Sequence, residues 1–120
     1  LRPTQFKEIK NMSITSKVKQ SVVLTADGQV QKLISGAATN IGKASILSVF
    51  AQSTAADGEV KLYNESDDSK TAARLIFHGK FGAGDNAVHE FKIPAAGIYA
   101  SDGIYADVTN VDFLYIIGTF

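Results

Sequence analysis

The sequence predicts an all-β domain, a single antiparallel β-sandwich with the jelly roll as its candidate topology. Short runs of alternating apolar and polar residues recur along the chain, and turn residues separate them at regular intervals. Three Asp-Gly pairs stand between such runs, at positions 27–28, 57–58 and 102–103. Asp and Gly tolerate the positive φ that tight turns require, so each pair indicates a turn between two strands.

The composition is that of one ordinary domain. The chain has 120 residues, of which 45% are hydrophobic, and this is enough to build a core. It contains no Cys, which excludes disulfides, thiolate metal sites and cysteine nucleophiles. No apolar run approaches the ~20 residues of a membrane-spanning helix. We therefore expect no membrane partner.

Charge divides the chain into two parts although the net charge is zero. Residues 1–20 carry five basic side chains against the single acid Glu8, a balance of +4, and the other residues carry −4. We expect residues 1–17 to form an extended basic arm on a sandwich of residues 18–120. A solvated terminus is the alternative. The side chains that we expect to contact a partner are Arg2, Lys7, Lys10, Lys17 and Lys19.

The first half of the chain predicts a hairpin followed by a central strand. Apolar residues alternate over 18–25 and 29–35, on the two sides of the first Asp-Gly pair, which indicates that these segments pair. Residues 45–51 are apolar on both parities, as expected of a central strand covered on both faces, and a short buried helix is the alternative. The β-formers in this run favour the strand. Residues 59–63 alternate and predict a half-solvated strand.

The second half predicts further strands and hairpins. Residues 74–78 and 88–93 alternate on the two sides of a glycine-rich turn, and we expect them to pair. The tetrapeptide Gly-Ile-Tyr-Ala occurs at 97–100 and again at 103–106, and it predicts two short strands that turn about the third Asp-Gly pair. Residues 111–117 are apolar on both parities and are placed in the centre of a sheet.

The sequence offers little for catalysis or for metal binding. His78 and His89 could face each other across one hairpin, but no third ligand has a suitable spacing. The oxygen-rich segment 64–68 lacks the EF-hand pattern. The glycines of 79–84 resemble a phosphate cradle, but the helix that such a cradle needs is not predicted. We therefore expect no enzyme activity, no metal and no cofactor.

The aromatic residues bear on possible partners. Phe50, Phe77, Phe91 and Phe113 lie in apolar runs expected in the core, away from the basic residues, so we expect no nucleic-acid partner.

Three tyrosines, in contrast, stand near turns or polar positions. An exposed patch of tyrosines is typical of protein interfaces and of sugar-binding platforms. We expect this patch to comprise Tyr63, Tyr99 and Tyr105.

Several segments resemble one known group of proteins. These are Phe91–Tyr99 (FKIPAAGIY) and Ser101–Val108 (SDGIYADV), together with Val60–Asn64 followed by Ala73–Phe77. They are similar to segments of small β-sandwich virion proteins of tailed bacteriophages, particularly marine podoviruses. The resemblance covers about half of the chain and includes no catalytic signature. It implies a structural component of the virion, on the outside of the capsid shell or at the portal and tail.

Our leading hypothesis is therefore a capsid decoration or cement protein, or a minor capsid protein, that stabilises the shell without enzymatic activity. Its expected location is the virion, assembled in the host cytoplasm. Its expected partners are the major capsid protein or other virion proteins, with the chain present as a homo-oligomer or in repeated copies. A tail or head-tail connector component is one alternative, and a carbohydrate-binding module is another.

Overall fold

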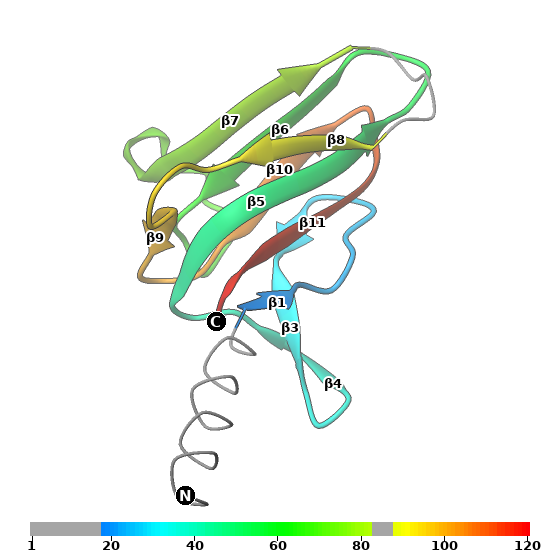
Figure 1. The fold of residues 1–120 in the computed structure, drawn as a ribbon. Helices are drawn as coiled ribbons and strands as arrows, with labels where there is room; N and C mark the ends of the chain where they lie inside the picture. The colour runs from blue at the N-terminus through cyan, green and yellow to red at the C-terminus, as the bar shows by residue number, and fades with distance from the viewer. Residues whose placement is uncertain (1–17, 83–87) are drawn as a thin grey trace, which may run out of the picture.

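The computed structural model describes residues 18–82 and 88–120. This part of the chain forms eleven strands and one short 3-10 helix, which confirms the prediction of an all-β sandwich. Two larger antiparallel sheets lie face to face, and a separate two-stranded hairpin extends from one end of them (Figure 1).

The first sheet, here called sheet A, is built around the two longest strands. Its order is β1 (Val18–Gln20), β11 (Val111–Thr119), β5 (Ala44–Ser53) and β8 (His89–Lys92). A further short strand, β9 (Ile98–Ala100), pairs with β5 on the same side as β8. Every pairing in the sheet is antiparallel.

The second sheet, here called sheet B, has four strands. Its order is β2 (Gly28–Gln29), β10 (Tyr105–Thr109), β6 (Gly58–Tyr63) and β7 (Leu75–Phe81). The 3-10 helix η1 (Ala72–Arg74) leads directly into β7. These pairings are also antiparallel.

The pairings of the two sheets are nested. With β3, β4 and β9 set aside as additions, the first strand β1 pairs with the last strand β11, and β2 pairs with β10. Further in, β5 pairs with β8, and β6 pairs with β7. One long folded hairpin rolled into two four-stranded sheets has this order, so the topology is that of a jelly roll.

The core lies between the two sheets and is built from alternate positions of their strands. On β5 and β11, buried residues alternate with half-buried ones along most of the strand. Each fully buried Val, Leu or Ile side chain stabilises the fold by about 1.5–3 kcal/mol. The largest fully buried side chains are Val30, Ile41, Ile46, Val49, Val60, Leu62, Ile104, Leu114 and Ile116.

A separate hairpin joins β3 (Gln31–Ile34) to β4 (Ala37–Asn40). Its two-residue turn has positive φ at both central positions, 51° at Ser35 and 83° at Gly36. Such a turn matches the twist of the two strands. The hairpin projects beyond the end of the two sheets, close to the carboxyl terminus (Figure 1).

The base of this hairpin is fixed in the body. Val30 and Ile41 flank the hairpin, and they are 1% and 2% exposed. The Ile41 N–H donates to the Val30 carbonyl over 3.1 Å. The hairpin is therefore held at its base by two core residues, while β4 and the end of β3 next to the turn are exposed.

The first predicted hairpin is wrong. Segments 18–25 and 29–35 do not form a pair of strands, because β1 lies beside β11 and β2 lies beside β10. The Asp-Gly pair at 27–28 instead leads from sheet A to sheet B, and the pairs at 57–58 and 102–103 do the same. A turn signal specifies a change of direction, whereas the sheet that the next strand joins depends on distant residues.

Two other predicted pairings are also wrong. The strands flanking the glycine-rich turn are β7 and β8, and they belong to sheet B and sheet A respectively. The repeated tetrapeptides contribute to β9 and β10, which again lie in different sheets. In each case the strands exist where they were predicted, but the chain crosses the sandwich between them.

The two strands predicted at a sheet centre, 45–51 and 111–117, do lie there, as β5 and β11. Coverage on both faces was expected of 45–51, but only the face toward sheet B is buried. Phe50 and Phe113, expected in the core, lie half-buried on the opposite face. An apolar run on both parities shows that both faces are apolar, without showing what covers the second one.

Gly118 tests the packing of β5 against β11. A Cβ at this position would lie 2.3 Å from the Ser45 carbonyl oxygen. We expect Gly118→Ala to lower the free energy of unfolding by about 1–3 kcal/mol, because the backbone has to shift. Gly42→Ala is the matched control, since a Cβ at Gly42 meets nothing within 4 Å. Urea unfolding measures both variants, and equal effects would contradict the close approach of the two strands.

Candidate interaction site

The predicted basic arm lies outside the described residues for the most part. Arg2, Lys7, Lys10 and Lys17 fall within 1–17, so their role as partner contacts stays a prediction. Lys19 is described, and it is exposed on β1 at the edge of sheet A.

The predicted tyrosine patch does not form as expected. Tyr63 and Tyr105 are direct neighbours across β6 and β10, and they are 7% and 9% exposed. Burial raises the pKa of Tyr105, with the nearby carboxylate of Asp27 adding to the rise. The expectation of exposure is therefore wrong for these two residues. Tyr99 is 59% exposed, and it lies on β9 in sheet A.

A different apolar surface covers the side of sheet A that faces away from sheet B. The Phe50 and Tyr115 rings lie 4.9 Å apart between centroids, and the Phe113 and Tyr115 rings lie 6.3 Å apart. All of these side chains are half-buried. We call this surface the outer aromatic face; it comprises Leu47, Phe50, Phe113, Tyr115 and Ile117.

Charged residues border the outer aromatic face. Glu90 on β8 stands directly opposite Phe50, and its carboxylate accepts a hydrogen bond of 3.3 Å from the Ser48 hydroxyl. Lys92 follows on the same strand, opposite Ser48, and Asp112 is exposed at the start of β11. The apolar surface therefore has a polar rim, as protein interfaces commonly do.

The end of the β3–β4 hairpin is a second exposed apolar surface. Leu33 is 62% exposed and Ile34 is 50% exposed, and successive strand residues point to opposite sides. Leu33 stands opposite Ala38 and Ile34 stands opposite Ala37, so the hairpin is apolar on both of its sides. We call residues 33–38 the hairpin tip. Lys32 lies on the same side as Ile34, nearer to the body.

The sequence contained the signals for both surfaces. The outer aromatic face comes from the two runs that are apolar on both parities, and the tip comes from Leu33 and Ile34 next to the Ser35-Gly36 turn. Sequence reasoning missed the first surface because its two runs were assigned to the centre of a sheet, and it missed the second because residues 29–35 were assigned to a hairpin with 18–25. Partial burial of large apolar groups on a monomer's surface is a signal for a partner when they are contiguous.

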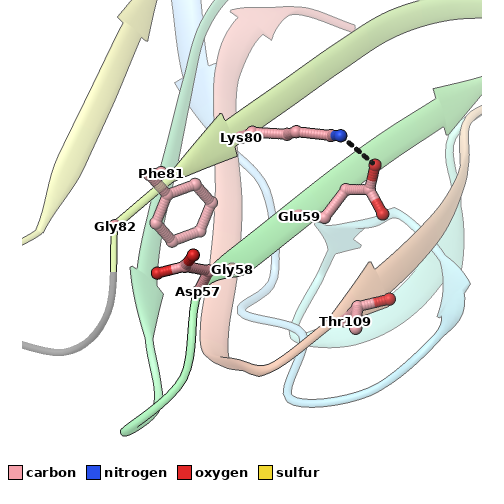
Figure 2. Close-up of a pocket in the computed structure, with 7 residues that line it drawn as sticks. All are labelled: Asp57, Gly58, Glu59, Lys80, Phe81, Gly82 and Thr109. Carbon is pink, nitrogen blue, oxygen red and sulfur yellow. Dashed lines mark ion pairs between the residues drawn. The ribbon is translucent and has the colours of Figure 1, made fainter.

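Charged residues line a shallow pocket of about 480 Å³ at the start of β6. In it, Glu59 faces Lys80 with 4.0 Å between carboxylate oxygen and amine, and the Phe81 ring packs beside Gly58 (Figure 2). His78 Nε2 lies 2.5 Å from the same Glu59 carboxylate.

This arrangement keeps the carboxylate charged. The hydrogen bond with His78 is the main reason that the pKa of Glu59 lies below its ordinary value, and the neighbouring positive charges add smaller effects. A general acid working at neutral pH has a raised pKa instead. The chemistry of this pocket is therefore that of an ion-pair cluster on the surface.

The two histidines do not meet. His78 lies on β7 in sheet B, and His89 lies on β8 in sheet A with its ring 5.0 Å from the Phe81 ring. Among residues 18–82 and 88–120, no group of three His, Cys, Asp or Glu side chains is placed to hold a metal ion.

The oxygen-rich loop after β6 uses its polar groups internally. Glu65 is 7% exposed, and its carboxylate accepts hydrogen bonds from the Thr71 N–H and hydroxyl over 3.0 and 2.7 Å. Arg74 forms an ion pair with Asp102 and donates to the Asn64 carbonyl over 2.8 Å. These contacts tie the loop to the body and engage the Glu65 carboxylate within the protein.

Comparisons of the chain with protein-family models, with curated proteins and with solved structures found no match. The resemblance to phage virion proteins therefore stays a prediction drawn from the residues themselves. In the part of the chain that the structure describes, no helix has the length and apolar character needed to cross a membrane.

The Glu59 cluster gives a pH prediction. We expect His78→Ala to raise the pKa of Glu59 toward its ordinary value, because the main stabilising contact of the carboxylate is lost. Lys80→Ala is the control and should raise that pKa less, since Lys80 makes the smallest contribution. An NMR titration of the Glu59 carboxyl carbon measures both. Equal shifts would contradict the assigned hydrogen bond.

The sign of the effect on stability follows from the same shift. Because the pKa of Glu59 is lowered in the folded state, its contribution is present above the ordinary carboxyl pKa and is lost as the pH falls through the lowered one. The free energy of unfolding of the His78→Ala variant should therefore differ less between neutral and acidic pH than that of the wild-type protein.

Proposed function

We propose that this chain is a non-enzymatic structural protein of a virion, a capsid decoration or minor capsid protein that stabilises a shell in repeated copies. The observation that supports this proposal is a jelly-roll body that presents two apolar contact surfaces, the hairpin tip and the outer aromatic face. Viral capsid proteins are among the proteins built on this topology, and lectins are others.

The fold by itself does not select a function, so the surfaces carry the argument. Leu33 is 62% exposed and Ile34 is 50% exposed, and both lie at the end of a projecting hairpin. Contiguous apolar groups exposed in such a position mark an interaction site, and an assembling protein buries them in a contact. The charged groups near these surfaces form a rim, and the described pocket holds an ion-pair cluster.

Repetition strengthens contacts of this kind. One small apolar contact is weak, but many copies on one particle act together, because each copy that binds holds the next site at high effective concentration. The basic arm of residues 1–17 adds an electrostatic contact with an acidic surface in this account. The body then supplies apolar contacts and the arm supplies charged ones.

A carbohydrate-binding module is the second candidate function. The stripe of Phe50, Tyr115 and Phe113 favours it, because sugars stack on partly exposed aromatic rings. A glycan array probed with the protein decides between them. Saturable binding to a defined glycan, lost in Tyr115→Ala, would replace the structural proposal, and no saturable binding would remove the module.

Copy number tests the position in the particle. Quantitative mass spectrometry of purified virions from the source phage should find on the order of hundreds of copies, because a shell offers many equivalent sites. About a dozen copies or fewer would instead place the chain at the portal or tail, where the symmetry is low. Absence from the particle would contradict the virion proposal in every form.

Deletion of residues 1–17 tests the arm. The core residues of the described part of the chain all lie within the sandwich, and we expect the truncated protein to unfold at the same urea concentration as the full chain. Its retention on particles should fall, and retention of the full chain should fall with added salt. A full-length variant in which Gln replaces Arg2, Lys7, Lys10 and Lys17 separates the effect of the positive charges from the effect of the chain length. Unfolding of the truncated body would contradict the division between arm and sandwich.

A further inference from the structure

We propose that the hairpin tip of one copy docks on the outer aromatic face of a second copy of this chain. This inference rests on the proposed function for the supply of neighbouring copies, and it goes further by naming the partner of both apolar surfaces. The observation behind it is that one chain carries two complementary surfaces that do not meet within a molecule.

The hairpin needs a partner for a physical reason. A two-stranded hairpin alone in water is marginally stable. All four residues of β4 are exposed, as are Leu33 and Ile34 of β3. The buried residues Val30 and Ile41 fix only its base. Contact with another apolar surface would cover the tip and stabilise its strands.

The partner surface lies outside the molecule to which the tip belongs. Leu33 remains 62% exposed although the outer aromatic face is part of the same chain. The hairpin extends beyond the end of the sheets and points away from β5 and β11 (Figure 1). The two surfaces can therefore meet only between different copies.

The two surfaces match in chemistry. On the hairpin, Lys32 and Ile34 lie two positions apart on one side, about 7 Å along the strand. On the outer aromatic face, Glu90 stands opposite Phe50 on the neighbouring strand, about 5 Å away. An apolar group and a charge therefore lie side by side on each surface, and the two charges are opposite. Ile34 against Phe50 would bring Lys32 within reach of Glu90.

This contact is heterologous, because one copy offers the tip and the other offers the face. Each copy has one surface of each kind, so the contact can repeat from copy to copy into a ring or a chain. A repeating contact of this kind suits a protein present in many copies on one particle. The tip buries few side chains, so a single contact should be weak and should gain strength in the array.

Self-association of the purified full chain tests the proposal. Sedimentation velocity over a concentration series should show reversible association, and Ile34→Ser should raise the dissociation constant about tenfold or more, because Ile34 lies on the side of the tip that carries Lys32. Leu75→Ser is the matched control, because Leu75 is also exposed, at 38%, but lies on β7 in sheet B. Thermal unfolding checks that both variants keep the fold.

Either of two results would overturn the inference. One is a wild-type protein that stays monomeric up to about 1 mM, a concentration at which even weak contacts form. The other is an equal effect of Ile34→Ser and Leu75→Ser, which would show that the tip has no special part in association.

A charge exchange tests the choice of surface. Lys32→Glu and Glu90→Lys should each weaken association severalfold, because like charges then meet. The double variant carries both changes in every copy and should recover most of the affinity. Lys43→Glu alters an exposed lysine outside both surfaces and should have little effect. Failure of the double variant to recover would exclude the outer aromatic face as the docking site.

These experiments separate the inference from the proposed function. They use the protein without particles, so loss of self-association would leave attachment to a shell unaffected. A wild-type protein that stays monomeric in solution, together with loss of the Ile34→Ser variant from particles, would assign the tip to a different virion protein and would overturn docking between copies.

Discussion

The antiparallel pairing of β5 with β11 is the interaction on which the rest of the structure depends. It joins residues 58 to 74 positions apart, from Val111 opposite Ser53 to Thr119 opposite Ser45. β1 attaches to the free side of β11, and β8 and β9 attach to the free side of β5, so sheet A cannot form without it. The approach at Gly118 leaves no room for a side chain. The inner side of this pair supplies Ile46, Val49, Leu114 and Ile116 to the core.

The same pair presents apolar residues on its outer side, and this links fold to function. A strand that alternates between apolar and polar residues places one side in water at no cost, but β5 and β11 leave Phe50, Phe113 and Tyr115 half-buried there. The fold already has its core without them. In the proposed account a partner covers them, and it also covers Leu33 and Ile34, which are exposed on the hairpin. The proposed function therefore rests on apolar residues that lie outside the core.

The sequence predicted the fold class and the strands but not their partners. Alternation located β6 and β8, and runs apolar on both parities located β5 and β11, because these patterns reflect local burial. The three Asp-Gly pairs indicated turns, yet each leads the chain into the other sheet, which depends on long-range packing. The candidate site was predicted poorly for the same reason: Tyr63 and Tyr105 were expected outside and pair inside, whereas Phe50 was expected inside and lies on the surface.

A distance measurement between copies tests the central claim most directly. The chain has no Cys, so a Ser35→Cys variant can carry one spin label at the hairpin tip. The spin-labelled variant, at natural isotope abundance, would be mixed with ¹⁵N-labelled wild-type protein. Only the wild-type copies then give signals, and a spin label on a neighbouring copy broadens them. The account predicts broadening at Phe50 and Tyr115 on sheet A, with Lys61 on sheet B unaffected. No broadening, or broadening centred on sheet B, would contradict it.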